Sequence, residues 1–442
     1  MKYALPLLLA LSTLATLPAL AQTQPGTTQA PNRIDGYGAP VGPPVPVNRA
    51  ADETTIDIIG GYYQQDGTHG AVEGGRGTQQ LTDVPPAIII NIPLDTLSRL
   101  SVNVGADFYS SASTDRIDFA LSTPSAHDVR VHGDFGYSRE QKAKGTLWGV
   151  GTGVSKEYDY LSFNVAGSFA RTSRDGNRQL GLAGQVFFDQ VTLIPPTELR
   201  TSGTQGKRVY GTDTRQTYNL TATYSQVLTK RLQLAVSTEL VSQNGLLSTP
   251  FHRVYFRDNP DANPAPAAGS DFATRVATAA RMEALPRSRF KYPISLRLSY
   301  YATDVVQIRA FYRFYNDNFG IVAHTAELEL PVKVTPFFVL YPFYRYHIQT
   351  AARYFAPFQQ HSVADGFYTS DYDLSAFSAH KTGLGLRYSP LYGLTRFRVP
   401  GQDAQGRPRV MRLKSLDLRY AHYQQSTDLM ANIVSFDLGF AL

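Results

Sequence analysis

The sequence predicts an all-β fold: a transmembrane, antiparallel, up-and-down β-barrel of about 16 strands (roughly 14–18), with both termini on the periplasmic side. Apolar and polar residues alternate along segments of about ten to fourteen residues, whereas the strands of a soluble β-sandwich average about five or six. The chain also ends in such a segment. In addition, 27 Tyr and 24 Phe occur in a chain that is only 43% hydrophobic. Membrane barrels have this profile because aromatic residues gather at the two interfaces around a polar lumen.

The C-terminal strand carries the most specific signal. Its apolar residues alternate with Ser435, Asp437, Gly439 and Ala441. A strand of this kind at the end of the chain resembles the assembly signal of Gram-negative outer-membrane barrels, although Leu442 stands where Phe is commoner. We therefore expect an outer-membrane location and binding to the barrel-assembly machinery. The expected assembly-signal residues are Phe436, Leu438, Phe440 and Leu442.

The first 50 residues read as two segments outside the barrel. Lys2, an apolar run and Ala19-Leu20-Ala21 predict a signal peptide over residues 1–21, removed after Ala21. A membrane anchor helix is the alternative. Residues 22–50 are rich in Pro and Gly and predict an extended periplasmic tail, unless the tail folds back as a plug. The chain has no Cys, which excludes lipid attachment at a cysteine, disulfides and thiol chemistry.

Residues 51–442 form the predicted barrel. Short turns and long loops alternate along it, and the longest outer loop is 244–287, in which Ser270 or Asp271 caps an expected short helix through Leu285. One segment, 391–410, is long although it falls on the periplasmic side. The expected strands lie near residues 54–65, 86–94, 99–110, 128–138, 146–155, 160–171, 178–189, 213–227, 231–243, 288–301, 305–315, 321–333, 337–349, 380–390, 412–425 and 431–442.

Strand parity assigns a set of charged residues to the lumen. A charge facing lipid at mid-depth costs about 2–4 kcal/mol, so the arginines of the strand 305–315 must face inward. In a hairpin, Arg309 is then expected near Glu329 and Arg313 near Glu327. Arg345, on the next strand, is expected within a diagonal step of Glu327. This set is either a charged constriction that filters solutes or a structural network of ion pairs. Its members are Arg297, Arg309, Arg313, Glu327, Glu329 and Arg345.

Features of an enzyme are absent from the sequence. None of the nine His forms an H-x-x-x-H or HExxH pair, and no G-x-S-x-G occurs. His132 and Asp134 share a lumen-facing parity, but such a pair is usually structural. A single weak oxygen-rich stretch, Asp258 to Asp261, lacks the spacing of an EF-hand. We therefore expect no enzymatic activity, no catalytic residue, no metal site and no cofactor, and the spread-out charge of +6 indicates no nucleic-acid partner.

Three stretches of the second half resemble a known family when taken together. The chain resembles the Gram-negative envelope proteins catalogued as the domain of unknown function numbered 3570. The resemblance implies an outer-membrane barrel and carries no activity or site residues. The stretches are Ser225–Leu232, Tyr312–Ile321 with His324-Thr325, and Tyr368–Ser375 ahead of Gly383–Arg387.

The functional expectation is a channel or porin-like protein for small hydrophilic solutes, surrounded by outer-membrane lipid. The alternative is a closed structural or interaction barrel, which presents its loops or anchors a periplasmic protein partner through residues 22–50 and 391–410.

Overall fold

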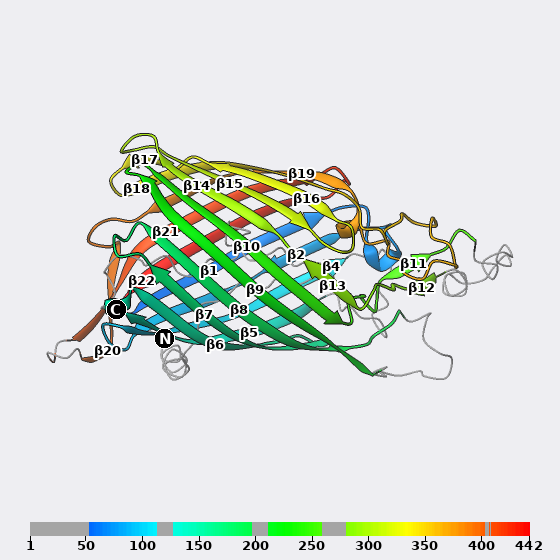
Figure 1. The fold of residues 1–442 in the computed structure, drawn as a ribbon, viewed down its shortest axis with the longest axis horizontal. Coiled ribbons are helices and arrows are strands. Elements are labelled where there is room, and N and C mark those ends of the chain that lie inside the picture. The colour runs from blue at the N-terminus through cyan, green and yellow to red at the C-terminus, as the bar shows by residue number, and fades with distance from the viewer. Residues whose placement is uncertain (1–52, 113–126, 197–210, 259–279, 403–405, 407) are drawn as a thin grey trace, which may run out of the picture.

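The computed structural model describes residues 53–112, 127–196, 211–258, 280–402, 406 and 408–442. Within these residues, 16 antiparallel strands form a closed barrel (Figure 1). The barrel closes between its first and last strands, because β1 (Thr55–Asp66) pairs with β22 (Met430–Ala441) over the full length of both. The expected fold class and strand number are therefore confirmed.

Three of the sixteen barrel strands are interrupted, each at proline: Pro85-Pro86, Pro293 and Pro331. Proline donates no backbone hydrogen bond, so the ladder breaks there and resumes on the same neighbours. Between β1 and β22, the barrel strands are β2 with β3 (Gln80–Val84, Ala87–Pro93), β4 (Ser98–Ala112), β5 (His127–Gln141), β6 (Thr146–Lys156), β7 (Tyr160–Thr172), β8 (Arg178–Thr192), β9 (Thr212–Thr229), β10 (Leu232–Gly245), β13 with β14 (Ser288–Lys291, Ile294–Tyr301), β15 (Gln307–Asn316), β16 with β17 (Val322–Glu329, Val332–Thr335), β18 (Phe338–Gln349), β19 (Phe377–Tyr388) and β21 (Pro408–Gln425).

The outer surface of the barrel is apolar. On neighbouring strands, Tyr312, Leu328 and Ile348 expose 42%, 44% and 43% of their surface, while charged residues of the opposite parity face the lumen. A belt of exposed apolar side chains around a closed barrel is stable only in lipid. The protein is therefore an outer-membrane barrel. Among the described residues, no helix has the length and hydropathy needed to cross a bilayer.

The two ends of the barrel differ, and we name them the turn end and the loop end. Backbone hydrogen bonds between Thr54 and Leu442, of 3.1 and 2.8 Å, join the first and last described segments at the turn end. Short connections lie there, as expected. In one of them Asp95 accepts the backbone N–H groups of Leu97 and Ser98 at 2.6 and 2.7 Å. The expected signal peptide and tail, residues 1–50, lie outside the described residues.

The long connection at the turn end has a structural explanation. Within it, β20 (Thr395–Gln402) pairs with the first half of β21, so that Thr395 lies opposite Leu413 and Gln402 opposite Pro408. Figure 1 shows β20 beyond the barrel wall, at the same end as the C-terminus. The described residues of this segment therefore form two paired strands, β20 and the start of β21, that project beyond the barrel wall.

Loops at the opposite end pack into a folded unit, which we call the loop cap. It contains the described parts of the connections after β1, β10, β15 and β18, with the short strands β11 (Arg253–Tyr255) and β12 (Ala280–Met282) and the 3-10 turns η2 (Ala71–Glu73) and η6 (Tyr372–Leu374). The first part of the helix expected through Leu285 lies outside the described residues, which resume at Ala280. From there the expectation is wrong, since Ala280–Met282 pairs with β11 as a strand. A hydrophobic cluster of Leu247, Leu285, Phe319, Ile321, Ala323 and Ala352 joins three of the loops.

The loop cap spans the mouth of the barrel. Its η2 turn follows the first barrel strand, whereas β11 follows β10, the ninth of the sixteen, on the opposite side of the circle. The two nevertheless touch, because Arg253 donates from Nη1 to the backbone oxygen of Val72 at 2.7 Å and lies 4.0 Å from Glu73. Loops from opposite walls thus meet over the lumen.

Candidate functional site

The candidate lumen residues lie on one wall, where the structure brings most of them together. Arg309 on β15 lies directly across from Glu329 on β16, and their charged groups are 2.7 Å apart. The expected pairing is confirmed. Glu329 is 2% exposed and also faces Arg419 of β21 at 3.8 Å. The buried Glu329 carboxylate therefore lies close to guanidinium groups from β15 and β21, which are not neighbouring strands.

Arg313 has a different partner from the one expected. The two strands of an antiparallel pair run in opposite directions, so a step of four residues up β15 is a step of four residues down β16. Since Arg309 lies across from Glu329, Arg313 lies across from Thr325 and not from Glu327. The ion pair of Arg313 is with Glu239 on β10, at 3.1 Å. To reach it, the side chain crosses β14 at Ser295, which pairs with Arg313 and is small. The expectation of an Arg313–Glu327 pair was wrong.

Four further charged residues lie on the same inner wall. Glu327 lies opposite Arg345 on β18, and Arg345 lies opposite Lys381 on β19. Arg345 is thus directly across from Glu327, within the diagonal step that was expected. Arg297 on β14 lies across from Phe311, with its guanidinium carbon 5.5 Å from the centre of that ring. We call the whole set the lumen belt: Arg297, Arg309, Arg313, Arg345, Lys381, Arg419, Glu239, Glu327 and Glu329.

Parity identified six of these nine residues and missed Glu239, Lys381 and Arg419. Arg419 reaches the belt because β19, which separates β21 from β18, carries Gly383 and Gly385 on its inner face. A Cβ atom on Gly385 would lie 2.0 Å from the Tyr341 ring, and one on Gly383 would lie 2.3 Å from the Phe343 ring. The two rings therefore lie over the glycines, and Arg419 stacks on Phe343 at 3.8 Å. The repeated glycines of this strand are the sequence signal that the parity argument overlooked.

The expected assembly-signal residues lie on or next to the closing strand. Phe436, Leu438 and Phe440 belong to β22, and Leu442 follows it at the turn end. Phe436 is 39% exposed on the outer face, and it lies over Gly60, where a Cβ atom would come within 2.4 Å of its ring. Their role in assembly stays a prediction.

By simple alternation Arg412 and Lys414 would face lipid, but a bulge between Leu413 and Ser415 shifts the register of β21 there, and Arg412 lies opposite Ala441. Both Arg412 and Lys414 bind Glu53, which precedes β1, and the Lys414 Nζ–Glu53 Oε2 distance is 2.7 Å. The hydrogen bond from Lys414, followed by attraction from both cations, holds the pKa of the Glu53 carboxyl below its ordinary value, although burial opposes this. These two ion pairs, which we call the Glu53 ion pairs, thereby connect the residues just before β1 to β21.

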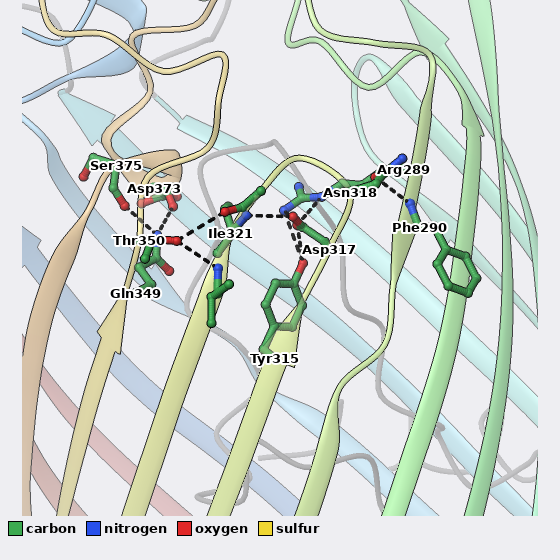
Figure 2. A network of polar contacts seen from close by, with 12 residues as sticks. Arg289, Phe290, Tyr315, Asp317, Asn318, Ile321, Gln349, Thr350, Asp373 and Ser375 are labelled. Atoms are coloured by element: carbon green, nitrogen blue, oxygen red, sulfur yellow. Dashed lines mark hydrogen bonds and ion pairs between the residues drawn. The ribbon is translucent and has the colours of Figure 1, made fainter.

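Beneath the loop cap, a buried polar network fixes the β15–β16 connection (Figure 2). Asp317 has no exposed side-chain surface, and it accepts hydrogen bonds from Arg289 Nε at 2.9 Å, from the Tyr315 hydroxyl at 2.7 Å and from the backbone N–H of Ile321 at 3.0 Å. Nearby, Gln349 donates to the backbone oxygens of Asp373 and Ser375 at 3.0 and 2.8 Å. The network ties barrel strands to two loops.

Several of these network residues lie in two of the three stretches on which the family resemblance rests. Tyr315, Asp317 and Ile321 belong to Tyr312–Ile321, whereas Asp373 and Ser375 belong to Tyr368–Ser375. A fully hydrogen-bonded buried aspartate is costly to disturb, because any one missing partner leaves an unpaired charge. Two of the three stretches thus lie at the base of the loop cap and on the belt strand β19, whereas Ser225–Leu232 spans the β9–β10 turn.

Comparison with known proteins gives a family and distant structural similarity. Residues 45–395 match the family described as "Protein of unknown function (DUF3570)". No curated protein matches the sequence. Among solved structures, a bacterial polysaccharide outer membrane secretin is 11% identical over 89% of this chain and 99% of that chain, with a TM-score of 0.42.

Two further solved structures are similar at the same level. OccK1 (OpdK) of Pseudomonas aeruginosa is 8% identical over 88% of this chain and 98% of its own, with a TM-score of 0.37. CdiB from Acinetobacter baumannii is 10% identical over 87% of this chain and 60% of its own, with a TM-score of 0.43. At such values the similarity carries no functional information.

Proposed function

We propose that this chain, which belongs to the DUF3570 family, is an outer-membrane channel that admits small hydrophilic solutes and favours anions. The observation that carries the proposal is the lumen belt, in which six cationic side chains face three carboxylates on one inner wall. A barrel of this size can hold water, and charged rings select solutes in pores. In this proposal the loop end faces outward, the turn end faces the periplasm, and the loop cap narrows the outer mouth.

Conductance in a planar bilayer tests the channel directly. The refolded protein should give steady ohmic steps, and the reversal potential across asymmetric salt should show anion preference. Because Arg309→Ala with Arg313→Ala removes two belt cations, that variant should shift the selectivity toward cations by a measurable change in reversal potential. Arg174→Ala with Arg178→Ala is the matched control, since both arginines are exposed at the β7–β8 turn, and it should leave selectivity unchanged.

The second candidate is a closed interaction barrel, and the bridging of the mouth by η2 and β11 favours it. In that case a folded, heat-modifiable barrel would stay electrically silent at every voltage. Silence in the wild type would exclude the passive channel, and the search would turn to proteins that bind the loop cap or the projecting strands β20 and β21.

A further inference from the structure

One cluster of titratable side chains in the loop cap takes no part in the lumen belt. His252 directly precedes β11, and Glu283 directly follows β12. The pairing of Arg253 with Met282 places the two residues at adjoining positions, and Glu283 donates its backbone N–H to the His252 oxygen at 3.0 Å. The third member, Asp371, caps the η6 turn in the loop between β18 and β19. Two separate loops therefore contribute to one cluster.

The cluster is buried and its imidazole has no hydrogen-bond partner. His252 is 1% exposed and Glu283 is 6% exposed, while the Asp371 side chain is 12% exposed. Neither ring nitrogen of His252 makes a hydrogen bond. Its Nδ1 atom points at two carboxylates, lying 3.8 Å from Glu283 Oε1 and 3.8 Å from Asp371 Oδ2. A buried polar ring left without partners is uncommon and costly.

Other groups of the loop cap hold both carboxylates in place. Glu283 Oε2 accepts the backbone N–H of Thr249 at 2.7 Å, and its Oε1 accepts the Thr369 hydroxyl. Asp371 Oδ1 accepts the backbone N–H of Asp373 at 3.0 Å, which leaves Oδ2 directed at His252. Outer partners of this kind orient ligands in metal sites.

The distances fit a shared ion better than direct contact. A hydrogen bond between imidazolium and carboxylate spans about 2.7–2.9 Å, so 3.8 Å is too long. Ligand atoms that bind one ion at about 2.0–2.2 Å lie roughly 3.3–3.7 Å from each other, close to the observed separation. All three donor atoms lie within 4.8 Å of one another. An ion would also offset the charge of two buried carboxylates.

We propose that His252, Glu283 and Asp371 bind one divalent transition-metal ion, which fastens the β10–β13 loop to the β18–β19 loop across the mouth of the barrel. One imidazole and two carboxylates suit zinc or its neighbours, whereas calcium and magnesium prefer oxygen ligands alone. Three protein ligands leave a coordination position open to water or to a partner. The bound ion would cross-link two loops of the loop cap, and a chelator would remove this cross-link.

Zn²⁺ binding to the refolded full-length chain tests the site without reference to transport. After treatment with EDTA, calorimetric titration should show one Zn²⁺ ion per chain. His252→Gln should weaken this affinity at least about 10-fold, since a ligand matters at least as much as an outer partner. Asp371→Asn, which keeps the shape of the η6 cap, is the second ligand variant. His324→Gln is the matched control, because it removes an exposed histidine of the outer face that is bonded to Tyr312, and its affinity should equal the wild type.

Two further readouts decide the outcome. Co²⁺ should give visible absorption in the wild type and not in His252→Gln, and Zn²⁺ should slow protease cleavage of the loop cap. A folded wild type that binds no Zn²⁺, or Zn²⁺ binding that neither ligand variant weakens, would overturn the proposal. Folding of each variant is checked by heat-modifiable migration. A channel without Zn²⁺ affinity would disprove the site alone, and a silent barrel that binds Zn²⁺ would disprove the channel alone.

Discussion

At the residue scale, Gly385 decides how the belt is assembled. Its missing side chain leaves space for the Tyr341 ring, and the Tyr341 hydroxyl donates to Asp417, which also binds Arg387 at 2.8 Å. Arg419 lies directly opposite Gly385 on β21. A glycine in a strand normally weakens it, so its use here follows from the close approach of larger groups above it.

Gly385→Ala should destabilise the barrel by about 1–3 kcal/mol, because the added methyl group overlaps a ring that is held at both ends. Equilibrium unfolding by urea in lipid vesicles measures this change. Gly167→Ala is the matched control, since no atom lies within 4 Å of its added Cβ. Equal stability of the Gly385 and Gly167 variants would show that Tyr341 moves aside freely.

At the element scale, the two ends of the barrel are secured differently. The loop end of β15 and β16 depends on the buried Asp317 network, whereas the turn end of β1 and β21 depends on Glu53 and its two cations. The Glu53 ion pairs are partly exposed, since 36% of the Glu53 side chain is accessible, so solvent screens their attraction. This connection is therefore the weaker of the two devices, and its contribution to stability depends on pH.

Glu53→Gln should lower stability modestly at neutral pH and have no effect in acid. The folded-state pKa of Glu53 is lowered, so its contribution is complete above the ordinary glutamate pKa and disappears as the pH falls through the lowered value. Urea midpoints of the two proteins should differ near pH 7 and converge as the pH falls through the lowered pKa of Glu53. A difference that persists unchanged in acid would mean that the carboxylate charge is not what binds Lys414.

At the scale of the whole molecule, the loop cap and the barrel are held by different kinds of contact, and we expect the loop cap to open while the barrel stays folded. The barrel is held by a closed ladder of backbone hydrogen bonds, and the loop cap by small apolar clusters, such as Val254, Phe256 and Tyr368. Tyr255 joins three loops, because its ring packs 4.7 Å from that of Phe358 and lies against Gly74. Regions with few such contacts open independently of the core.

Tyr255→Ala should loosen the loop cap and leave the barrel intact. Limited proteolysis should cut the loops at least several-fold faster, while heat-modifiable migration stays that of the wild type. If the protein is a channel, its conductance should also rise. Tyr158→Ala, which removes a tyrosine that is 63% exposed between β6 and β7, should change neither property. Unchanged proteolysis of the Tyr255 variant would contradict the bridging role of β11.

Much of the barrel follows from the sequence alone because membrane strands obey a local rule. Each residue alternates between lipid and lumen, and a charge on the wrong face costs about 2–4 kcal/mol, so parity assigns Arg297, Arg309, Arg313 and their neighbours without knowledge of the partners. The strand set was predicted in this way, whereas the outer-membrane location was predicted from the C-terminal strand. The Arg309–Glu329 pair also followed, since a hairpin sets its register locally.

Strand parity does not say which distant side chains contact each other, and only the tertiary structure shows these contacts. The pairing of Arg313 with Glu239, the reach of Arg419 across two glycines and the cluster of His252, Glu283 and Asp371 all join residues far apart along the chain. Loops have no periodic pattern, so their packing depends on shape and burial. The sequence by itself determined which faces the strands present. The tertiary structure determined which distant side chains meet, because strand pairing and loop packing bring together residues of strands and loops that are not adjacent in the chain.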